Sequence, residues 1–519
     1  MADGPVMSTS LPSAVAPILL HPTDDVAVVG VDTPAGTELT IAGITVRTAS
    51  DVPSGHKVAL RAIAPNAPVR KYGEIIGYAV GAIAPGDHVH VDNLEYRPVD
   101  RADVLPSPRP TPPRPRATRT FQGYRRKNGK VGTRNMIGLL TTVNCSASVS
   151  RFIAAQVEKQ GLLRDYPNID GIVALTHTSG CAMPTAGEGF EILRRTILGY
   201  ANHPNFGGIL LLSLGCETNE LQGLMEDPRL DVPVPLRALV IQEQGGTRET
   251  VQAGIEALQE LLPAINDVQR EPIPASELIV GMECGGSDAY SGIAANPVVG
   301  RASDRIVWEG GTAAFAETPE IYGAEHLLAD RARDPQVAQK LYDRIHWWER
   351  YSVINDGSMD SNPAPGNKAG GITTILEKSL GAIAKGGTTD LVEVVEYGEP
   401  MHGPGLVFMD TPGYDPVSVT GLVAGGAQVI CFTTGRGSVF GCKPVPSIKV
   451  ASNSPMFNRM RDDMDVNAGR VVDGTATVDE VGDELFELIL EVASGRQPLS
   501  EEMGIGQDEF APWPMGAVM

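Results

Sequence analysis

Downstream of about residue 120, hydrophobic residues occur in short continuous runs separated by amphipathic segments. The runs are MIGLLTTV, GIVALTH, GGILLLSLG and ELIVGME. Between the last two, TRETVQAGIEALQELL places Val251, Ile255, Leu258 and Leu262 on one helical face. Strands that alternate with helices predict a mostly parallel sheet with helices on its faces.

The same alternation resumes at about residue 366. LVEVVEYG, GLVFMDTPG and AQVICFTTG are strand-like, and TVDEVGDELFELILEVASG is typical of a closing helix. Thr477 and Glu480 form a capping box there, and Gly495 supplies the C-terminal stop. We therefore expect an α/β catalytic domain at 121–365 and a second α/β domain at 366–519.

Residues 17–96 show a different pattern. Short apolar runs such as DDVAVVGVD, ITVRTA and GEIIGYAVGAI are separated by turn signals, which predicts a small β-rich domain. The prolines of 97–120 favour an extended, semi-rigid linker. Residues 1–16 are expected to form a disordered tail.

Composition narrows the classes of partner. A formal net charge of -21 repels nucleic acid and anionic membrane surfaces, so we expect neither. No apolar run approaches the roughly 20 residues of a membrane helix, and the N-terminal segment lacks the basic region of a signal peptide. Six cysteines in 519 residues are too few for a disulfide scaffold and indicate reduced thiols in the cytoplasm.

Four of these cysteines follow predicted strands. Cys145, Cys181, Cys216 and Cys284 each come at or shortly after a strand's carboxyl end. Ligands bind at that edge of open α/β sheets, so we expect the four thiols to share one rim. The alternative is burial as small hydrophobic residues. That alternative fits Cys431, which lies within a strand, whereas Cys442 is ambiguous.

The cysteine spacing lacks the paired CxxC motifs of a zinc ribbon. Dispersed thiols with a nearby imidazole, His177 in THTSGC, suit Fe(II) or an iron–sulfur centre better. A thiolate ligand lowers the Lewis acidity of its metal, and hydroxy-acid oxygens prefer metals with oxygen or imidazole ligands. The four cysteines therefore need not all be ligands.

Glycine-rich loops form a second group of candidates. Residues 362–374 and 433–444 place Lys368 and Arg436 among glycines, which is typical of anion binding as well as of ordinary turns. Neither loop matches GxxxxGK[ST] or GxGxxG, so a nucleotide is not indicated. In ECGGSD, two glycines permit close backbone approach and the next two residues offer polar contacts; these are Gly285, Gly286, Ser287 and Asp288.

The β-rich domain supplies a third group, His21, His56, Lys71 and Tyr72. Histidines at strand ends are more often satisfied structural residues than ligands. His88 and His90, in HVH, alternate onto one strand face and could chelate a metal.

Taken together, the motifs resemble the altronate/galactarate dehydratase family of sugar-acid hydro-lyases. HPTDDVAVV, PSGHKVAL and KYGEIIGYA resemble its N-terminal SAF (β-clip) domain. The catalytic part is matched by GYRRKNGKVGTRN, NCSAS, HTSGCAM, LGCETN, ECGGSDAYSGIAANPVVGRASD, PGNKAGGITTILEKSLGAIAKGG and FTTGRGSVFG. The ordered motifs span nearly the whole chain from about residue 17.

The resemblance implies an Fe(II)- or Mn(II)-dependent removal of water from an aldonate or aldarate, such as galactarate or altronate. The product would be a 2-keto-3-deoxy sugar acid. An iron–sulfur cluster is the alternative cofactor. The same family pattern covers sulfolactate sulfo-lyase, so a sulfo-lyase or a dehydratase of a shorter hydroxy acid is the first alternative function. A non-catalytic sugar-acid binding protein is the second.

Motif position and residue chemistry assign the roles. His177 is the expected base or ligand and Lys368 the alternative base. Lys368 or Arg436 would hold a substrate carboxylate, and His21 and His56 would be brought over the site. The full expectation is: catalytic residues His177, Lys368, Ser287 and Asp288; substrate-binding residues His56, Lys71, Tyr72, Asn144, Arg436, Gly285 and Gly286; metal ligands His21, Cys145, Cys181, Cys216 and Cys284. We expect a homodimer, the commonest oligomer.

Overall fold

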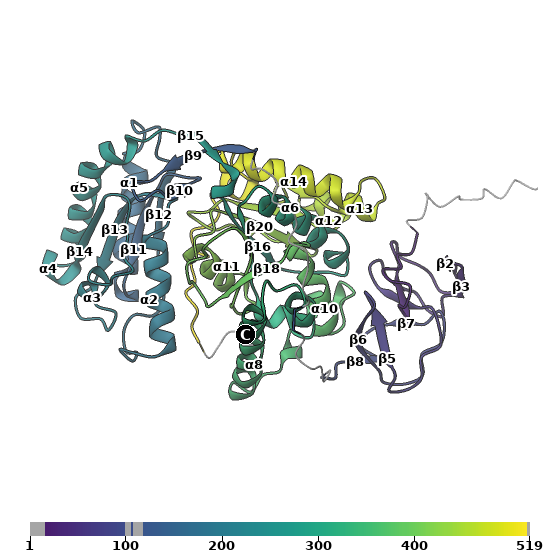
Figure 1. The fold of residues 1–519 in the computed structure, drawn as a ribbon. Coiled ribbons are helices and arrows are strands. Elements are labelled where there is room, and N and C mark those ends of the chain that lie inside the picture. The colour runs from purple at the N-terminus through teal and green to yellow at the C-terminus, as the bar shows by residue number, and fades with distance from the viewer. Residues whose placement is uncertain (1–15, 99–104, 107–117, 516–519) are drawn as a thin grey trace, which may run out of the picture.

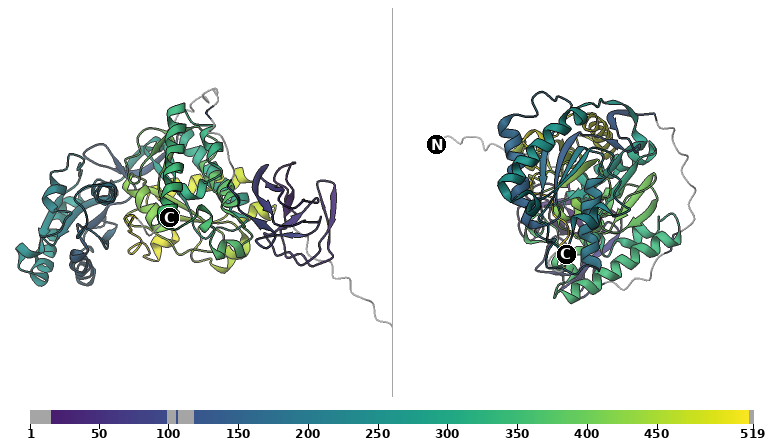
Figure 2. Two further views of the ribbon diagram at one scale, coloured as in Figure 1. Left: turned by 90° about the horizontal axis from the view of Figure 1, so that it is seen from below. Right: turned by 90° about the vertical axis from the view of Figure 1, so that its left-hand side faces the viewer.

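The computed structural model describes residues 16–98, 105–106 and 118–515. The expected tail at 1–16 and the expected linker at 97–120 therefore lie largely outside the described residues. Three bodies follow one another across the molecule (Figure 1; Figure 2). The N-terminal domain and the second domain flank a larger central domain, which confirms a small β-rich domain followed by α/β layers.

The N-terminal domain consists of short antiparallel strands around a small apolar core. One sheet has the order β1-β4-β7, a second has the order β5-β6-β8, and β2 pairs with β3. Buried side chains such as Val58, Val69 and Ile76 fill the space between them. The strands are β1 Val26–Val28, β2 Glu38–Ile41, β3 Ile44–Arg47, β4 Lys57–Ala59, β5 Pro68–Lys71, β6 Glu74–Ala79, β7 His88–Val89 and β8 Leu94–Glu95.

The second domain is a four-stranded parallel sheet of order β12-β11-β13-β14. Side chains alternate between the faces of β11, so that Ile137 and Leu139 pack under α1 and α5, whereas Leu140 packs under α2. The elements are β11 Met136–Thr141, α1 Ala147–Gln160, β12 Gly171–Leu175, α2 Glu188–Ala201, β13 Phe206–Ser213, α3 Leu221–Met225, β14 Leu236–Val240, α4 Ile241–Gln244 and α5 Thr247–Asn266.

A small antiparallel sheet joins the second domain to the central one, in the order β10-β9-β15. Its strands are β9 Thr120–Arg125, β10 Val131–Gly132 and β15 Glu271–Pro274. The same three strands lie together above the two larger domains in Figure 1.

The central domain is a seven-stranded parallel sheet of order β18-β19-β17-β16-β20-β21-β22. Helices α6 and α14 pack on one face, and α11 packs on the other. The strands are β16 Ile279–Cys284, β17 Thr312–Phe315, β18 Leu391–Val395, β19 Gly405–Met409, β20 Val429–Thr434, β21 Ser447–Ala451 and β22 Val466–Asn467. The helices are α6 Asn296–Trp308, α7 Glu325–Ala329, α8 Pro335–Ile354, α9 Pro365–Ala369, α10 Ile375–Ala382, α11 Asp415–Ala424, α12 Ser454–Arg459, α13 Gly469–Val472, α14 Val478–Ala493 and α15 Leu499–Glu502.

The chain order of these strands reverses beside β16. From β16 the chain adds β17 beside it, then β18 at the edge of the sheet and β19 between β17 and β18. It then returns to place β20 on the other side of β16. Open α/β sheets bind ligands at the carboxyl ends of strands next to such a reversal. The gap between the ends of β16 and β20 is thus the expected position of a site.

The structure differs from the expected domain boundary at 365/366. β16 and β17 belong to the same sheet as β18 to β22, so the central domain begins near β16 rather than after α8. The local pattern shows that each strand exists, but the pairing of Val280 with Val429 is a long-range contact that no local pattern reports. Within residues 16–98 and 118–515, none of the helices is long and apolar enough to cross a bilayer.

The N-terminal domain is fastened to the central domain by a buried ion trio. Lys57 Nζ lies 2.8 Å from Glu377 Oε2, and Lys71 Nζ lies 2.8 Å from Glu377 Oε1. Lys57 also donates to the carbonyl of Gly371 at 2.7 Å. All three charged side chains are at most 1% exposed, so removal of the glutamate leaves two lysines without a counter-charge.

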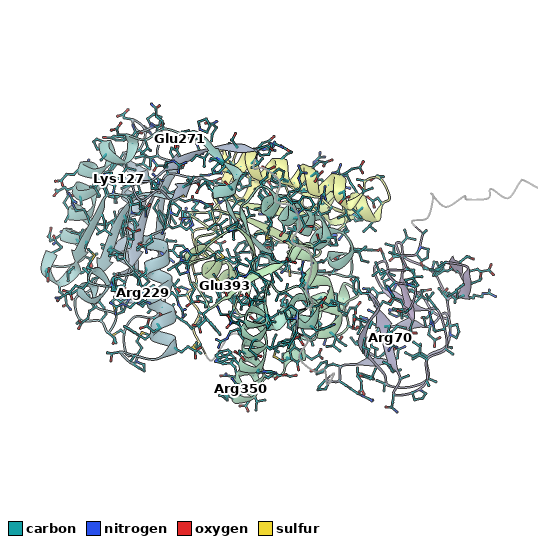
Figure 3. All side chains as sticks on the ribbon, viewed as in Figure 1. Arg70, Lys127, Arg229, Glu271, Arg350 and Glu393 are labelled. Atoms are coloured by element: carbon teal, nitrogen blue, oxygen red, sulfur yellow. The ribbon has the colours of Figure 1, made fainter. Side chains whose placement is uncertain are left out.

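We expect Glu377→Gln to destabilise the interface between the N-terminal and central domains by about 3–5 kcal/mol. This is the usual cost, about 3–5 kcal/mol, of removing one partner of a buried ion pair. Faster amide hydrogen exchange in β4, β5 and α10 would measure the loss. Glu393→Gln is the matched control (Figure 3), because its 2.7 Å pair with Lys340 is partly exposed and should be worth about 0–1 kcal/mol. Unchanged protection in Glu377→Gln would contradict the assignment of the trio as the main fastening.

Candidate active site

A cavity of about 320 Å³ opens at the carboxyl edge of the seven-stranded sheet, between the ends of β16 and β20. Its walls come from the loops after β16, β19 and β20, from the 3-10 turn at Thr318–Ile321, and from the segment 361–378. The lining residues are Cys284, Gly285, Gly286, Glu320, Ser361, Asn362, Ala364, Gly366, Asn367, Lys378, Gly413, Asp415 and Arg436. The cavity therefore lies at the strand-order reversal.

A buried network of acids, a thiol and two lysines forms the floor of this cavity. The Cys284 thiol donates to Glu317 Oε2 (3.3 Å) and to Glu320 Oε2 (3.4 Å). Lys385 Nζ donates to Glu317 Oε2 at 2.5 Å and to Cys284 Sγ at 2.9 Å. Lys378 Nζ donates to Glu320 Oε1 at 2.6 Å and to Asn362 Oδ1 at 2.7 Å.

Two further acids extend the network. Ligand atoms of Glu283, Glu317 and Asp415 all lie within 4.8 Å of one another, as do those of Cys284, Glu317 and Glu320. Glu317 belongs to both groups. Its backbone has a φ of 72°, in the left-handed region that costs free energy for a residue with a side chain, and its N–H is held by Thr411 Oγ1 at 2.9 Å. The fold thus holds Glu317 between the two groups against a local strain.

Burial shifts the proton equilibria of the network. Desolvation and the Glu317 charge raise the pKa of Glu283 and of the Cys284 thiol well above their usual values. Desolvation, with Glu317 and Glu320 nearby, raises the pKa of Asp415 to about 7. Burial alone would lower the pKa of Lys385, but the adjoining thiol and carboxyl groups raise it well above normal.

The network has the composition of a divalent-cation site. Four carboxyl groups and a thiol face only two lysines, so the network holds more potential metal ligands than cations. Glu317 Oε1 and Glu283 Oε1 are buried and have no hydrogen-bond partner among the described residues. Such atoms carry a desolvation cost that a bound cation would offset. Oxygen-rich ligand sets of this kind suit Mg²⁺, Mn²⁺ or Fe(II).

Glycine is required where β16 ends. A Cβ at Gly285 would lie 2.1 Å from Asp415 Oδ2 and 2.5 Å from the Phe432 ring, and Gly286 has a φ of 63°. The sequence indicated close approach at these glycines. In the structure, the neighbour that approaches Gly285 is the Asp415 carboxyl, so the glycine lets an acid from α11 reach the cavity.

Some predicted residues reach this cavity and some support it. Cys284, Gly285, Gly286 and Arg436 line it, whereas Lys368 lies on α9 next to the lining residues Gly366 and Asn367. Ser287 and Asp288, predicted as catalytic residues, are not among the residues that line this cavity, and their catalytic role stays a prediction. Asp288 is buried and accepts from Ser452 Oγ (2.7 Å) and Asn453 Nδ2 (2.9 Å), and the Ser287 carbonyl accepts from Asn367 Nδ2 (2.8 Å). Both residues hold the surrounding loops in place.

The expectation that four cysteines share one rim is wrong. Cys145, Cys181 and Cys216 lie in the loops after β11, β12 and β13 of the second domain, and only Cys284 belongs to the seven-stranded sheet. All four follow parallel strands as predicted, but the strands divide between two sheets. Asn144 and His177 accompany the first three, with Asn144 Nδ2 3.2 Å from the His177 carbonyl.

His177 is therefore not the base of this cavity. Its ring is buried, with Nε2 3.0 Å from the Thr141 carbonyl and Nδ1 3.1 Å from Ser179 Oγ. Burial lowers its pKa. An imidazole with both nitrogens in hydrogen-bond contact is a structural link between the β11 and β12 loops.

The predicted site residues of the β-rich domain also lie in different surroundings from one another. Lys71 pairs with Glu377 and lies over the Tyr72 ring, 4.9 Å from its centroid. Neither residue lines the cavity between β16 and β20, and their role in substrate binding stays a prediction. His21 is exposed, with Nδ1 2.7 Å from Thr23 Oγ1, and belongs to none of the potential metal-binding groups of three or more residues among the described residues. Its role as a ligand stays a prediction. His56 lies at the seam with the central domain, 3.4 Å from the Ala369 carbonyl.

Sequence reasoning missed most of the network, namely Glu283, Glu317, Glu320, Lys378, Lys385 and Asp415. Glu317 and Asp415 do carry a usable signal, because Glu317 directly follows a strand-like run and Asp415 begins the helix after DTPGY. Lys378 lies on α10 and Lys385 on the 3-10 turn Ile383–Gly386 that follows it, and charged residues in such segments usually indicate a solvated face.

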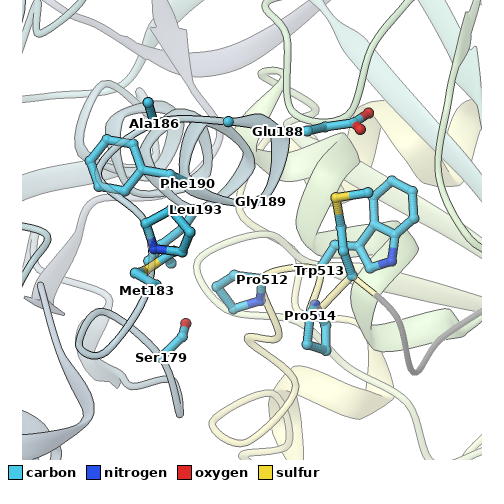
Figure 4. A pocket seen from close by; sticks show the side chains of 13 residues that line it. Ser179, Met183, Ala186, Glu188, Gly189, Phe190, Leu193, Pro512, Trp513 and Pro514 are labelled. Atoms are coloured by element: carbon cyan, nitrogen blue, oxygen red, sulfur yellow. The ribbon is translucent and has the colours of Figure 1, made fainter.

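A second cavity, of about 350 Å³, lies between the second domain and the C-terminal segment (Figure 4). Phe190, Leu193 and Met183 face Pro512 and Trp513 across it. It is somewhat larger than the first cavity, but Glu188 is the one ionisable group among its lining residues. The smaller cavity, which has more ionisable lining residues, is therefore the candidate active site.

Fold and site together define an enzyme, in which a seven-stranded α/β domain carries a buried acid–thiol–lysine network and a β-rich domain docks beside it. The chain belongs to the altronate/galactarate dehydratase family. The family's SAF domain matches residues 15–97, the second domain of D-galactarate dehydratase/altronate hydrolase matches 123–266, and the C-terminal domain of D-galactarate/altronate dehydratase matches 275–518.

Three named proteins are similar in sequence to most of this chain. The altronate dehydratase of Escherichia coli is 38% identical over 93% of this chain and 96% of its own length. The galactarate dehydratase (L-threo-forming) of the same bacterium is 39% identical over 94% and 95%. The (2R)-sulfolactate sulfo-lyase subunit beta of Chromohalobacter salexigens is 33% identical over 74% and 95%. The chain is accordingly an enzyme of the hydro-lyase type.

The burial of the thiols predicts their reactivity. In the native, reduced protein a thiol reagent such as DTNB should rapidly modify three cysteines, the exposed Cys145, Cys181 and Cys216. Cys284, Cys431 and Cys442 are buried, and burial raises the pKa of each thiol, so they should react only after denaturation. A Cys284→Ser variant should keep the same rapid count. A fourth rapid equivalent that disappears in this variant would contradict the buried position of Cys284.

Proposed function

We propose that this enzyme is a metal-dependent dehydratase that removes water from an aldonate or aldarate, such as altronate or galactarate, to give a 2-keto-3-deoxy sugar acid. The observation that carries the proposal is the buried acid–thiol–lysine network that opens into the cavity between β16 and β20. The names of the relatives, which cover more than nine-tenths of this chain, give the substrate class.

A divalent cation, Fe(II) or Mn(II), fits the network. Glu283 and Glu317, whose Oε1 atoms have no hydrogen-bond partner among the described residues, would hold it, with Cys284 and Glu320 beside them. When bound, the cation would stabilise the negative charge that develops on the substrate carboxylate as the C2 proton leaves. An iron–sulfur cluster needs several cysteines, and Cys284 is the one cysteine on the walls of this cavity. The mononuclear alternative is therefore the better fit here.

Arg436 and Lys378 provide the anchors for an acidic substrate. Both line the cavity, and no side-chain hydrogen bond or ion pair of Arg436 is found among the described residues. A guanidinium can donate two parallel hydrogen bonds to a carboxylate. The Lys378 ammonium, held between Glu320 and Asn362, offers a second positive charge. A diacid could use both.

Asp415 is the proposed proton acceptor. It lines the cavity, and its pKa of about 7 lets it accept a proton at neutral pH and release it again. In the proposed reaction the Asp415 carboxylate takes the C2 proton, the electron pair forms the C2–C3 double bond, and the C3–O bond breaks. Lys378 donates a proton to the departing hydroxyl, so that water leaves, and the enol becomes the 2-keto acid.

The relationship to a sulfolactate sulfo-lyase subunit supports one alternative, in which the bond that breaks is a C–S bond and sulfite leaves. The cavity residues would serve either elimination, because both begin with loss of the proton next to a carboxylate. The leaving group is set by the substrate, and an assay can decide it.

Activity should depend on the cation and on Asp415. Enzyme treated with a chelator should lose turnover of altronate or galactarate and recover it with Fe(II) or Mn(II) under anaerobic conditions, measured as 2-keto-3-deoxy product. Asp415→Asn should lower kcat about 10²- to 10⁴-fold, the usual contribution of a general base. Glu393→Gln, on the surface, should leave kcat unchanged.

Two outcomes would overturn the proposal. The first is full turnover by a metal-free enzyme. The second is inactivity towards every aldonate and aldarate in a screen with both metals. Release of sulfite from sulfolactate in that screen would replace the dehydratase with the sulfo-lyase. Binding of a sugar acid without conversion would identify a binding protein.

A further inference from the structure

A second cluster of potential metal ligands lies in the SAF domain, outside the cavity. His56 directly precedes β4, His88 opens β7, and His90 follows it; β4 and β7 pair antiparallel, with Val58 opposite His88. Since His88 and His90 are two residues apart in an extended segment, their side chains share a face. One ring nitrogen from each of the three histidines lies within 4.8 Å of the other two.

The nitrogen positions suit a shared ion. His56 Nδ1 and His88 Nε2 are 3.0 Å apart. Two imidazole nitrogens bound to one transition metal at about 2.0–2.1 Å are separated by roughly 3 Å. A hydrogen bond between His56 and His88 would also explain this distance, but it does not account for His90. His90 Nδ1 is buried and has no hydrogen-bond partner among the described residues.

The cluster adjoins the loop that forms one wall of the cavity. His56 Nε2 is 3.4 Å from the Ala369 carbonyl, and a Cβ on Gly371 would lie 2.6 Å from the Gly55 carbonyl oxygen. The same segment contributes Asn362, Ala364, Gly366 and Asn367 to the cavity wall. None of the three histidines lines the cavity itself.

We propose that His56, His88 and His90 form a three-imidazole binding site for a divalent transition-metal ion such as Zn²⁺, separate from the carboxylate-rich network at the cavity. Nitrogen ligands suit the borderline-soft Zn²⁺ and Co²⁺, whereas the oxygen-rich network suits harder cations. The bound ion would brace the SAF domain where it meets the 362–371 loop. This site does not depend on which reaction the cavity catalyses.

Co(II) binding to the full-length protein tests the site. Protein stripped with a chelator and titrated anaerobically with Co(II) should develop visible d–d bands of an imidazole-bound ion, and Zn²⁺ should displace them. The His88→Ala/His90→Ala variant should lose these bands and one equivalent of tight Co(II), with at least about 100-fold weaker binding, since even the loss of an outer-shell partner costs 10- to 100-fold. Glu317→Gln, which alters the other network, should retain the bands.

His346→Ala is the matched control, because His346 is an exposed histidine on α8. It should bind Co(II) as the unmodified protein does. Circular dichroism and the thiol count establish that the double variant is folded, and His90→Gln offers a milder change that should also weaken the bands. Identical Co(II) stoichiometry and spectra in the unmodified protein, the double variant and His90→Gln would overturn the proposal.

Discussion

The geometry of the cavity depends on one buried carboxylate, that of Glu317. It accepts hydrogen bonds from Lys385 and Cys284, and it is close enough to Glu283, Glu320 and Asp415 to influence the proton affinity of each. A carboxylate without solvent is stable only when its charge is paired. Lys385 supplies part of that pairing, and the free Glu317 oxygen is positioned for a cation. The same constraint therefore creates the pKa shifts and the proposed metal site.

The interface with the SAF domain also contains a buried carboxylate that is paired with lysines. Glu377 is buried between Lys57 and Lys71, so it joins the SAF domain to the central domain. The difference lies in the count of charges. The trio has two cations on one anion, whereas the cavity network has more acids than lysines and leaves two carboxylate oxygens without partners among the described residues.

Much of the fold was predictable from the sequence because strands and helices are specified locally. β11, β12, β13, β16 and α14 fall where the apolar runs and the capping box of Thr477 and Glu480 place them. Which strands share a sheet was not predictable, since the pairing of β16 with β20 connects distant parts of the chain. Because local patterns do not report which strands pair, the predicted domain boundary was misplaced and the four cysteines were wrongly expected at one sheet edge.

The candidate site was predictable only in part. Cys284, Gly285, Gly286 and Arg436 carry distinctive local signals, a thiol and glycines at strand ends, and they line the cavity. Glu317, Lys378 and Lys385 do not, because a charged residue in a loop or on a helix looks solvated until the tertiary structure buries it. The interpretation of His177 as a base failed for a related reason: both of its nitrogens are taken up by nearby loop groups.

The packing between the second and central domains has a consequence for how the enzyme opens. Residues of both sheets belong to one continuous hydrophobic cluster, including Leu140 and Leu211 from one and Val407 and Ile430 from the other. The α2 helix approaches α11 so closely that a Cβ on Gly199 would lie 2.3 Å from the Ala424 carbonyl oxygen. A shared apolar core favours movement of the second and central domains as one unit, whereas polar contacts usually permit domain motion. The SAF domain, which meets the central domain through charged and polar groups, is thus the part of the enzyme with more freedom to shift.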